Sequence, residues 1–158
     1  MPKRMHKKEV DLVVLALSSP IMVGVYENKK LLDSVVTEEK SSEILPVIYE
    51  TLEKTYTINN IFYAKGPGSF MAIKVAYIFL KSLSILKNIP LFATDAFYFN
   101  ENQPIKAVGK LYFVKTSTGI ETKKFDDVIM SDFKLPDFLN YDDFDIKTAP
   151  EYGIGAVG

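Results

Sequence analysis

The first forty residues alternate between apolar runs and short polar breaks, a pattern typical of strands joined by turns. Asp11 to Leu17 is a nearly continuous apolar run, which predicts a buried central strand. Ser18-Ser19-Pro20 interrupts it. Two further apolar runs, Ile21 to Tyr26 and Leu31 to Val36, flank the polar turn Glu27 to Lys30. So short a polar connection predicts an antiparallel hairpin.

The next segment has the period of a helix. A helix is expected to begin near Ser41 or Ser42, either of which could cap it, and Pro46 is tolerated because it falls about one turn in. Its apolar stripe is expected to include Leu45 and Tyr49 beside residues that recur at every fourth position, Ile44, Ile48, Leu52 and Tyr56.

A strand, a glycine turn and a second helix follow. Ile61 to Ala64 is a β-type run, Gly66-Pro67-Gly68 turns the chain, and Ser69 stands at the expected N-cap of a helix over Phe70 to Leu86. Leu91 to Ala93 is expected to be a short strand parallel to the first, because a helix connects the two. This order predicts an α/β fold with a mixed sheet covered by helices.

The glycine turn allows two interpretations. A strand, a glycine turn and a helix in that order leave N–H groups that can bind an anion or help form a partner surface. Alternatively, the glycines only permit a tight connection with positive φ. The turn lacks the Lys-Ser/Thr ending of a nucleotide-binding P-loop.

The second helix is unusually apolar. Of the nineteen residues from Ser69 to Lys87, thirteen are apolar, so an amphipathic surface helix with one polar, solvent-exposed face is not expected. Either elements of this chain cover both sides of the helix, or one side faces a partner.

The remaining sequence predicts a different, smaller unit. Ile105 to Val114 and Gly119 to Lys124 are expected to form a hairpin, and seven aspartates follow between Asp126 and Asp145. An EF-hand is not expected there because the glycine and terminal glutamate are missing, so a solvated acidic surface is favoured. We therefore predict a basic leader over 1–9, a first domain over 10–100 and a reduced second lobe over 101–158.

Composition removes several classes of chemistry. The net charge of −1 argues against broad adhesion to nucleic acid, and the absence of cysteine excludes disulfides and zinc–sulfur sites and would suit a reducing cytoplasm. The single histidine, His6, excludes a multi-histidine metal site, and a triad would have to use that leader residue. No secretion signal is visible, and lysines interrupt the long apolar helix, so no membrane span is expected.

The stretch from Tyr63 to Lys74 resembles a motif of the TsaB (YeaZ) family, close to GRGPGSFTGLR after an apolar strand. Gly66-Pro67-Gly68-Ser69-Phe70 matches it letter for letter, while Lys65 and Lys74 stand where the family has arginines. The resemblance extends over about residues 10 to 100.

The resemblance implies an actin-like ATPase fold built on a ribonuclease-H-like domain. It also implies a pseudo-enzyme, an inactive relative of TsaD in the machinery that forms threonylcarbamoyladenosine in tRNA. TsaB-like proteins bind a TsaD-like subunit through two helices, a TsaE-like ATPase joins them, and many form homodimers through the same surface. Contact with tRNA is then expected to be only indirect.

Two departures from the fold's enzymes support a pseudo-enzyme. Leu17-Ser18-Ser19-Pro20 occupies the place of the usual Asp-Thr phosphate loop, and the carboxylate needed to act through Mg²⁺ or water is missing. The H-x-x-x-H metal pair of TsaD-like enzymes cannot form either. No catalytic residue, cofactor or metal ligand is therefore predicted.

The predicted site is a partner interface built from the glycine turn and the two helices. Its residues are Lys65, Gly66, Pro67, Gly68, Ser69, Phe70, Ile73, Lys74, Tyr77, Ser42, Leu45 and Tyr49. Two alternatives stay open: an ATP-dependent small-molecule kinase or ATPase of the same fold, and a self-associating scaffold without a tRNA role.

Overall fold

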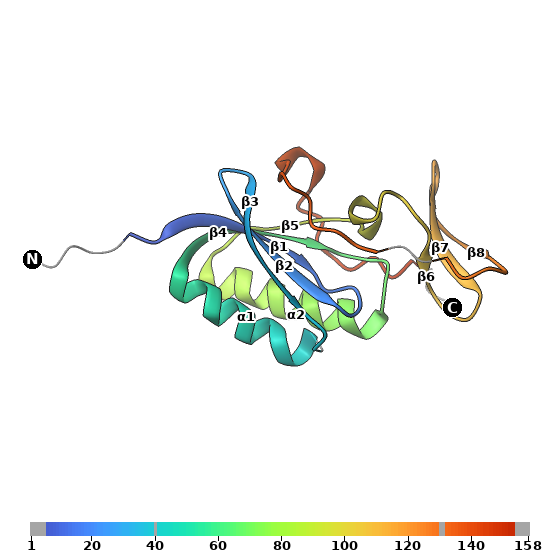
Figure 1. Cartoon of the computed structure of the whole chain (residues 1–158), viewed down its shortest axis with the longest axis horizontal. Coiled ribbons are helices and arrows are strands. Elements are labelled where there is room, and N and C mark those ends of the chain that lie inside the picture. Colours follow the sequence, from blue (N-terminus) through green and yellow to red (C-terminus); the bar gives the residue numbers. More distant parts are fainter. Residues whose placement is uncertain (1–5, 40, 130–131, 154–158) are drawn as a thin grey trace, which may run out of the picture.

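The computed structural model describes residues 6–39, 41–129 and 132–153, with the side chains of 41–43 excepted. Its centre is a five-stranded sheet in the order β3-β2-β1-β4-β5. The strands are β1 (Lys8–Leu15), β2 (Ile21–Glu27), β3 (Lys30–Thr37), β4 (Tyr56–Ala64) and β5 (Leu91–Thr94). Helices α1 (Ser41–Thr55) and α2 (Phe70–Lys87) lie side by side on one face of this sheet (Figure 1).

Strand pairing confirms the predicted mixed sheet. β1 pairs with β2 and β2 pairs with β3 in antiparallel fashion, whereas β1 pairs with β4 and β4 with β5 in parallel fashion. The β2–β3 hairpin turns at Asn28 and Lys29, both with positive φ (52° and 67°), as a tight two-residue hairpin turn requires.

Several predicted boundaries are wrong. Tyr56 does not continue the helix but opens β4, which begins five residues before the predicted Ile61. The reason is long-range: Tyr56 pairs with Lys8, and the ladder to β1 continues as far as Tyr63. Lys8 and Glu9, which the sequence places in the leader, consequently belong to β1, and the part of the leader over 1–5 lies outside the described residues.

The sheet carries a hydrophobic core on each face. The core on the helical face includes Val14, Leu45, Ile61 and Leu80. The core on the other face is built around Phe62 and Phe97 and is covered by η1 (Ala96–Phe99) and by the segment after Phe133. That segment touches both edges of the sheet, because Phe138 bridges to Lys30 and Asp145 to Ala93.

A second, three-stranded sheet contains β6 (Ile105–Lys106), β7 (Leu111–Thr116) and β8 (Gly119–Lys124). The predicted hairpin is confirmed, but the predicted single strand over 105–114 is broken between β6 and β7 by a turn with Gly109 at φ 57°. A short turn, η2 (Tyr141–Asp143), follows. Figure 1 shows this sheet beyond one end of the larger one. The division at residue 100 stays a prediction, since the segment after Phe133 returns to the first sheet.

None of the helices in the described part of the chain is long and apolar enough to cross a membrane.

Candidate partner-docking surface

The two helices leave an apolar surface uncovered on the side away from the sheet. On α2, Met71, Ile78 and Ile85 follow one another at intervals of seven residues, which places them along one side of the helix. Together with Leu86 and with Val47 of α1, they are between 54% and 82% exposed. We call these five residues the docking surface. The sequence-based alternative in which elements of this chain cover both sides of α2 is therefore wrong.

Charge along α2 has one sign. The helix carries Lys74, Lys81 and Lys87 and no acidic residue. Lys74 and Lys81 are exposed between the apolar positions of the docking surface, and Lys87 forms an ion pair with Glu53 of α1 at 3.5 Å. A partner that covers this surface would gain from acidic groups at its margin.

The inner faces of the two helices pack against the sheet and fix the orientation of the docking surface. Ile73, Ala76, Leu80 and Leu83 are the buried residues of α2. Tyr77 is half-buried and stacks on Tyr63 of β4, with ring centroids 6.4 Å apart. These contacts fix which face of α2 points outward.

Residues of α1 also pack against the sheet and link α1 to α2. Leu45 and Tyr49 are buried against the sheet. The Tyr49 hydroxyl donates to Glu53 Oε2 at 2.7 Å. Burial, and next this hydrogen bond, raise the pKa of Tyr49, while the same bond is the largest influence that lowers the pKa of Glu53. Glu53 thereby links Tyr49 to Lys87 and joins the ends of the two helices.

The glycine turn is closely packed against other parts of the chain. Gly66 has φ 118°, and a Cβ there would lie 2.1 Å from the carbonyl oxygen of Glu151. A Cβ on Gly68 would lie 3.0 Å from the carbonyl oxygen of Leu17. Close backbone approach and positive φ thus require glycine at position 66 and leave little room for a side chain at position 68, which favours the structural interpretation of the motif.

Two backbone donors beside the turn are also occupied. The N–H of Ser69 donates to Leu17 O at 2.8 Å, and that of Lys65 donates to Thr94 O at 3.0 Å. Ser69 has the extended conformation of an N-cap, as predicted, but its side chain makes no capping hydrogen bond. The turn therefore offers an external anion fewer free N–H groups than its sequence suggests.

A cavity of about 420 Å³ lies beside the turn, where the resemblance would place a phosphate site. It is lined by Leu17, Ser18, Ser19, Gly68, Ser69, Lys106, Val128, Ile129, Asp132 and Phe133. Leu17 is buried, and Asp132 is the one carboxylate among these lining residues. Within the described ranges, no three His, Asp or Glu side chains come together as a metal site. These residues do not fit magnesium-bound ATP.

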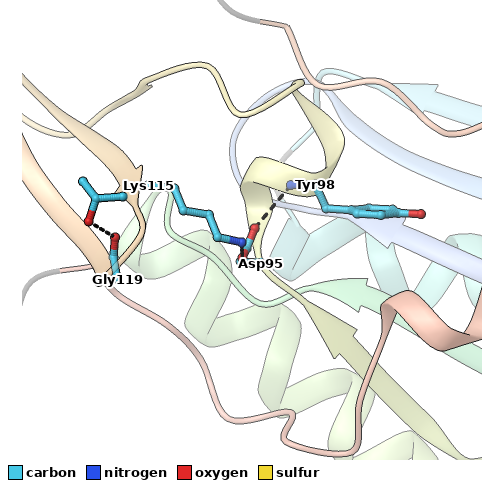
Figure 2. A network of polar contacts seen from close by, with 5 residues as sticks. Asp95, Tyr98, Lys115 and Gly119 are labelled. Atoms are coloured by element: carbon cyan, nitrogen blue, oxygen red, sulfur yellow. Dashed lines mark hydrogen bonds and ion pairs between the residues drawn. The ribbon is translucent and has the colours of Figure 1, made fainter.

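An ion pair ties the second sheet to the segment that follows β5 (Figure 2). Asp95 follows β5, and its Oδ1 accepts a hydrogen bond from the N–H of Tyr98 at 3.2 Å. Its Oδ2 pairs with Lys115 Nζ of β7 at 2.5 Å. Thr116 closes the adjoining hairpin by donating to Gly119 O at 3.0 Å.

The structure separates the predicted interface residues into three groups. Phe70, Lys74 and Ser69 are exposed. Ile73, Leu45, Tyr49, Gly66 and Pro67 are buried, and Lys65, Gly68 and Tyr77 lie between. The side chain of Ser42 lies outside the described residues. The sequence reasoning missed the docking-surface residues, although the seven-residue spacing of Met71, Ile78 and Ile85 is a signal that could have found them.

Comparison with known proteins gives one relative in sequence and several in structure. No protein-family model matches the chain. The tRNA threonylcarbamoyladenosine biosynthesis protein TsaB of Buchnera aphidicola is 31% identical over 92 residues, which are 52% of this chain and 42% of that protein. The matched part is thus less than half the length of the relative.

The YeaZ structure from Pseudomonas aeruginosa superposes with a TM-score of 0.56 at 13% identity, over 74% of this chain and 65% of YeaZ. The resemblance to the TsaB (YeaZ) family is confirmed. A second structure, described as an uncharacterised protein with similarity to the peptidase YeaZ from Pseudomonas aeruginosa, also has a TM-score of 0.56 at 13% identity, over 77% of this chain and 69% of its own. The chain accordingly has the predicted α/β, actin-like and ribonuclease-H-like fold.

Proposed function

We propose that this chain is a non-catalytic subunit of the complex that forms threonylcarbamoyladenosine in tRNA, and that it binds and activates a TsaD-like subunit. A TsaE-like ATPase would join the pair, and this chain would contact tRNA only indirectly. The docking surface on α1 and α2 carries the proposal.

The exposed stripe on α2 is the observation that favours docking. Met71, Ile78 and Ile85 offer large apolar side chains to solvent on a helix whose other face is fixed in the core. Large exposed apolar side chains on one face favour a protein interface, and the seven-residue spacing aligns these three along one side of α2. We propose that Leu45, Tyr49 and Ile73 support this surface from behind and do not touch the partner.

The charge of α2 favours a different protein over a second copy as the partner. In a symmetric pairing of α2 with α2, the lysines of one helix would approach lysines of the other, and neither helix carries an acidic residue. A TsaD-like face with acidic residues would avoid that repulsion. The self-associating scaffold is therefore the second candidate, since the apolar stripe alone would also suit a homodimer.

A role without catalysis is supported by the cavity at the glycine turn. Buried Leu17 stands where the fold's enzymes need a carboxylate, and Asp132 is the one acidic lining residue in the described part. A kinase or ATPase would instead require tight, magnesium-dependent binding of ATP by this chain alone, which calorimetric titration would detect.

Calorimetric titration of the chain with the TsaD-like protein of the same organism tests the proposal. We expect Ile78→Asp to weaken binding by at least about a hundredfold, because a charge would be buried at the centre of the interface. Phe138→Asp is the matched control, since Phe138 is an exposed aromatic residue in the segment that covers the opposite face of the sheet. Equal binding by both variants would contradict the proposal.

A further inference from the structure

Residues 147–153, which we call the strap, cross over the glycine turn and bind it through backbone and side-chain contacts. The N–H of Glu151 donates to Lys65 O at 2.8 Å, and Lys65 Nζ donates to Lys147 O at 3.0 Å. The hydroxyl of Tyr63 donates to Thr148 O, deep in the protein. The strap therefore pairs with polar groups of Tyr63 and Lys65, immediately before the glycine turn.

Glycine at two positions permits the strap to lie this close. The carbonyl of Glu151 occupies the space of a Cβ on Gly66, at 2.1 Å. Gly153 has φ 75°, and a Cβ there would meet the ring of Phe113 at 2.7 Å and Pro67 at 2.9 Å. The glycine turn thus packs directly against the strap of the same chain.

The strap reaches the first residue of α2 through a ring contact. Tyr152 packs against Phe70 with centroids 4.5 Å apart and an interplanar angle of 31°. Phe70 is 55% exposed and immediately precedes Met71, the first residue of the docking surface. The two rings therefore lie at the end of α2 where the docking surface begins in the sequence.

We propose that the strap is a positioning element that holds the first turn of α2 and adds the Phe70–Tyr152 ring pair to the docking surface. Tyr152 acts as a positioning residue through Phe70, and the added area suits an apolar patch on the partner. This inference rests on the proposed function, because it extends the same surface.

Three observations support this role over simple closure of the core. The strap contacts the turn that precedes α2, the rings meet at the exposed start of the helix, and Tyr152 itself is only half-buried. Because Phe70 lies at the helix start, losing its ring partner would free the end of α2 while leaving Leu80 and Leu83 packed.

Amide hydrogen exchange of the full chain, without a partner, tests the positioning. The reporters are the N–H of Ser69, bonded to Leu17 O, and that of Ile73, bonded to Ser69 O at 3.0 Å. We expect Tyr152→Ala to accelerate their exchange by roughly fivefold or more, because local opening of the helix end becomes easier. Tyr152→Phe, which keeps the ring, and Phe138→Ala should change it less than about twofold.

Calorimetric titration with the TsaD-like protein tests the added surface. We expect Tyr152→Ala to weaken binding by about tenfold and Tyr152→Phe to leave it unchanged. Native-like exchange and affinity in Tyr152→Ala, while Ile78→Asp loses binding, would overturn the inference and leave the proposed function intact. An equal rise in exchange across β1 would show general destabilisation and would also overturn it. If the native chain bound no TsaD-like protein, the proposed function would fail, and exchange at Ser69 and Ile73 would decide the positioning alone.

Discussion

At the scale of single residues, the glycine turn shows how a motif can combine packing with a place in an interface. Gly66 and Gly68 allow the strap and Leu17 to approach the backbone, so a side chain at either position meets a carbonyl oxygen. The same turn sets the start of α2 beside the docking surface. A matching motif therefore does not require an anion.

Two tyrosines give the fold a dependence on alkaline pH. Burial, followed by a hydrogen bond to Asp143, raises the pKa of Tyr98 to about 12. Burial, followed by the bond to Asp11, raises the pKa of Tyr141 to about 12. Because the folded pKa values exceed the ordinary value of 10, their contribution to stability is complete below pH 10 and is lost as the pH rises towards 12.

We therefore predict that the free energy of unfolding falls between pH 10 and pH 12, as denaturant titrations at successive pH values would show. Replacing Tyr98 by Phe should reduce this fall, since the group that must ionise is removed. A free energy of unfolding that is constant over this interval would contradict the assignment.

At the scale of elements, the pattern of apolar and polar residues predicted the strands and helices that depend on nearby residues alone. Alternating and continuous apolar runs located the strands and α2, and the helical connection gave the parallel pairing of β4 with β5. The end of α1 could not be predicted because Tyr56 suits a helix stripe and a strand equally, and its pairing with Lys8 decides. The course of the strap was equally hidden, since its contacts join residues about eighty positions apart.

The sequence could not show which residues of α2 face solvent. A helix that is apolar on every side does not reveal which face the sheet covers. The structure resolves this: Leu80 points to the core and Ile78 to solvent.

Matched substitutions on α2 test that division of faces. We predict that Leu80→Ala lowers the free energy of unfolding by about 2–5 kcal/mol, because it leaves a cavity in the core. Ile78→Ser should change it by less than about 0.5 kcal/mol, because the side chain is already in water. Urea denaturation measures both, and similar losses for the two variants would mean that the outer face is covered in the free chain.

At the scale of the whole molecule, neither of the two sheets nor the segment after Phe133 covers the outer face of α1 and α2. The second core, on the opposite side, is closed by η1 and by the segment after Phe133. The second sheet is anchored by Asp95 and Lys115 and lies beyond one end of the first, so it does not shield α2 (Figures 1 and 2). Docking is the function that this arrangement favours.

Size-exclusion chromatography with light scattering, on an equimolar micromolar mixture of this chain and the TsaD-like protein, tests the central claim most directly. The account predicts one peak with the summed mass of one copy of each. Two separate peaks, each at the mass of its own free protein, would contradict it.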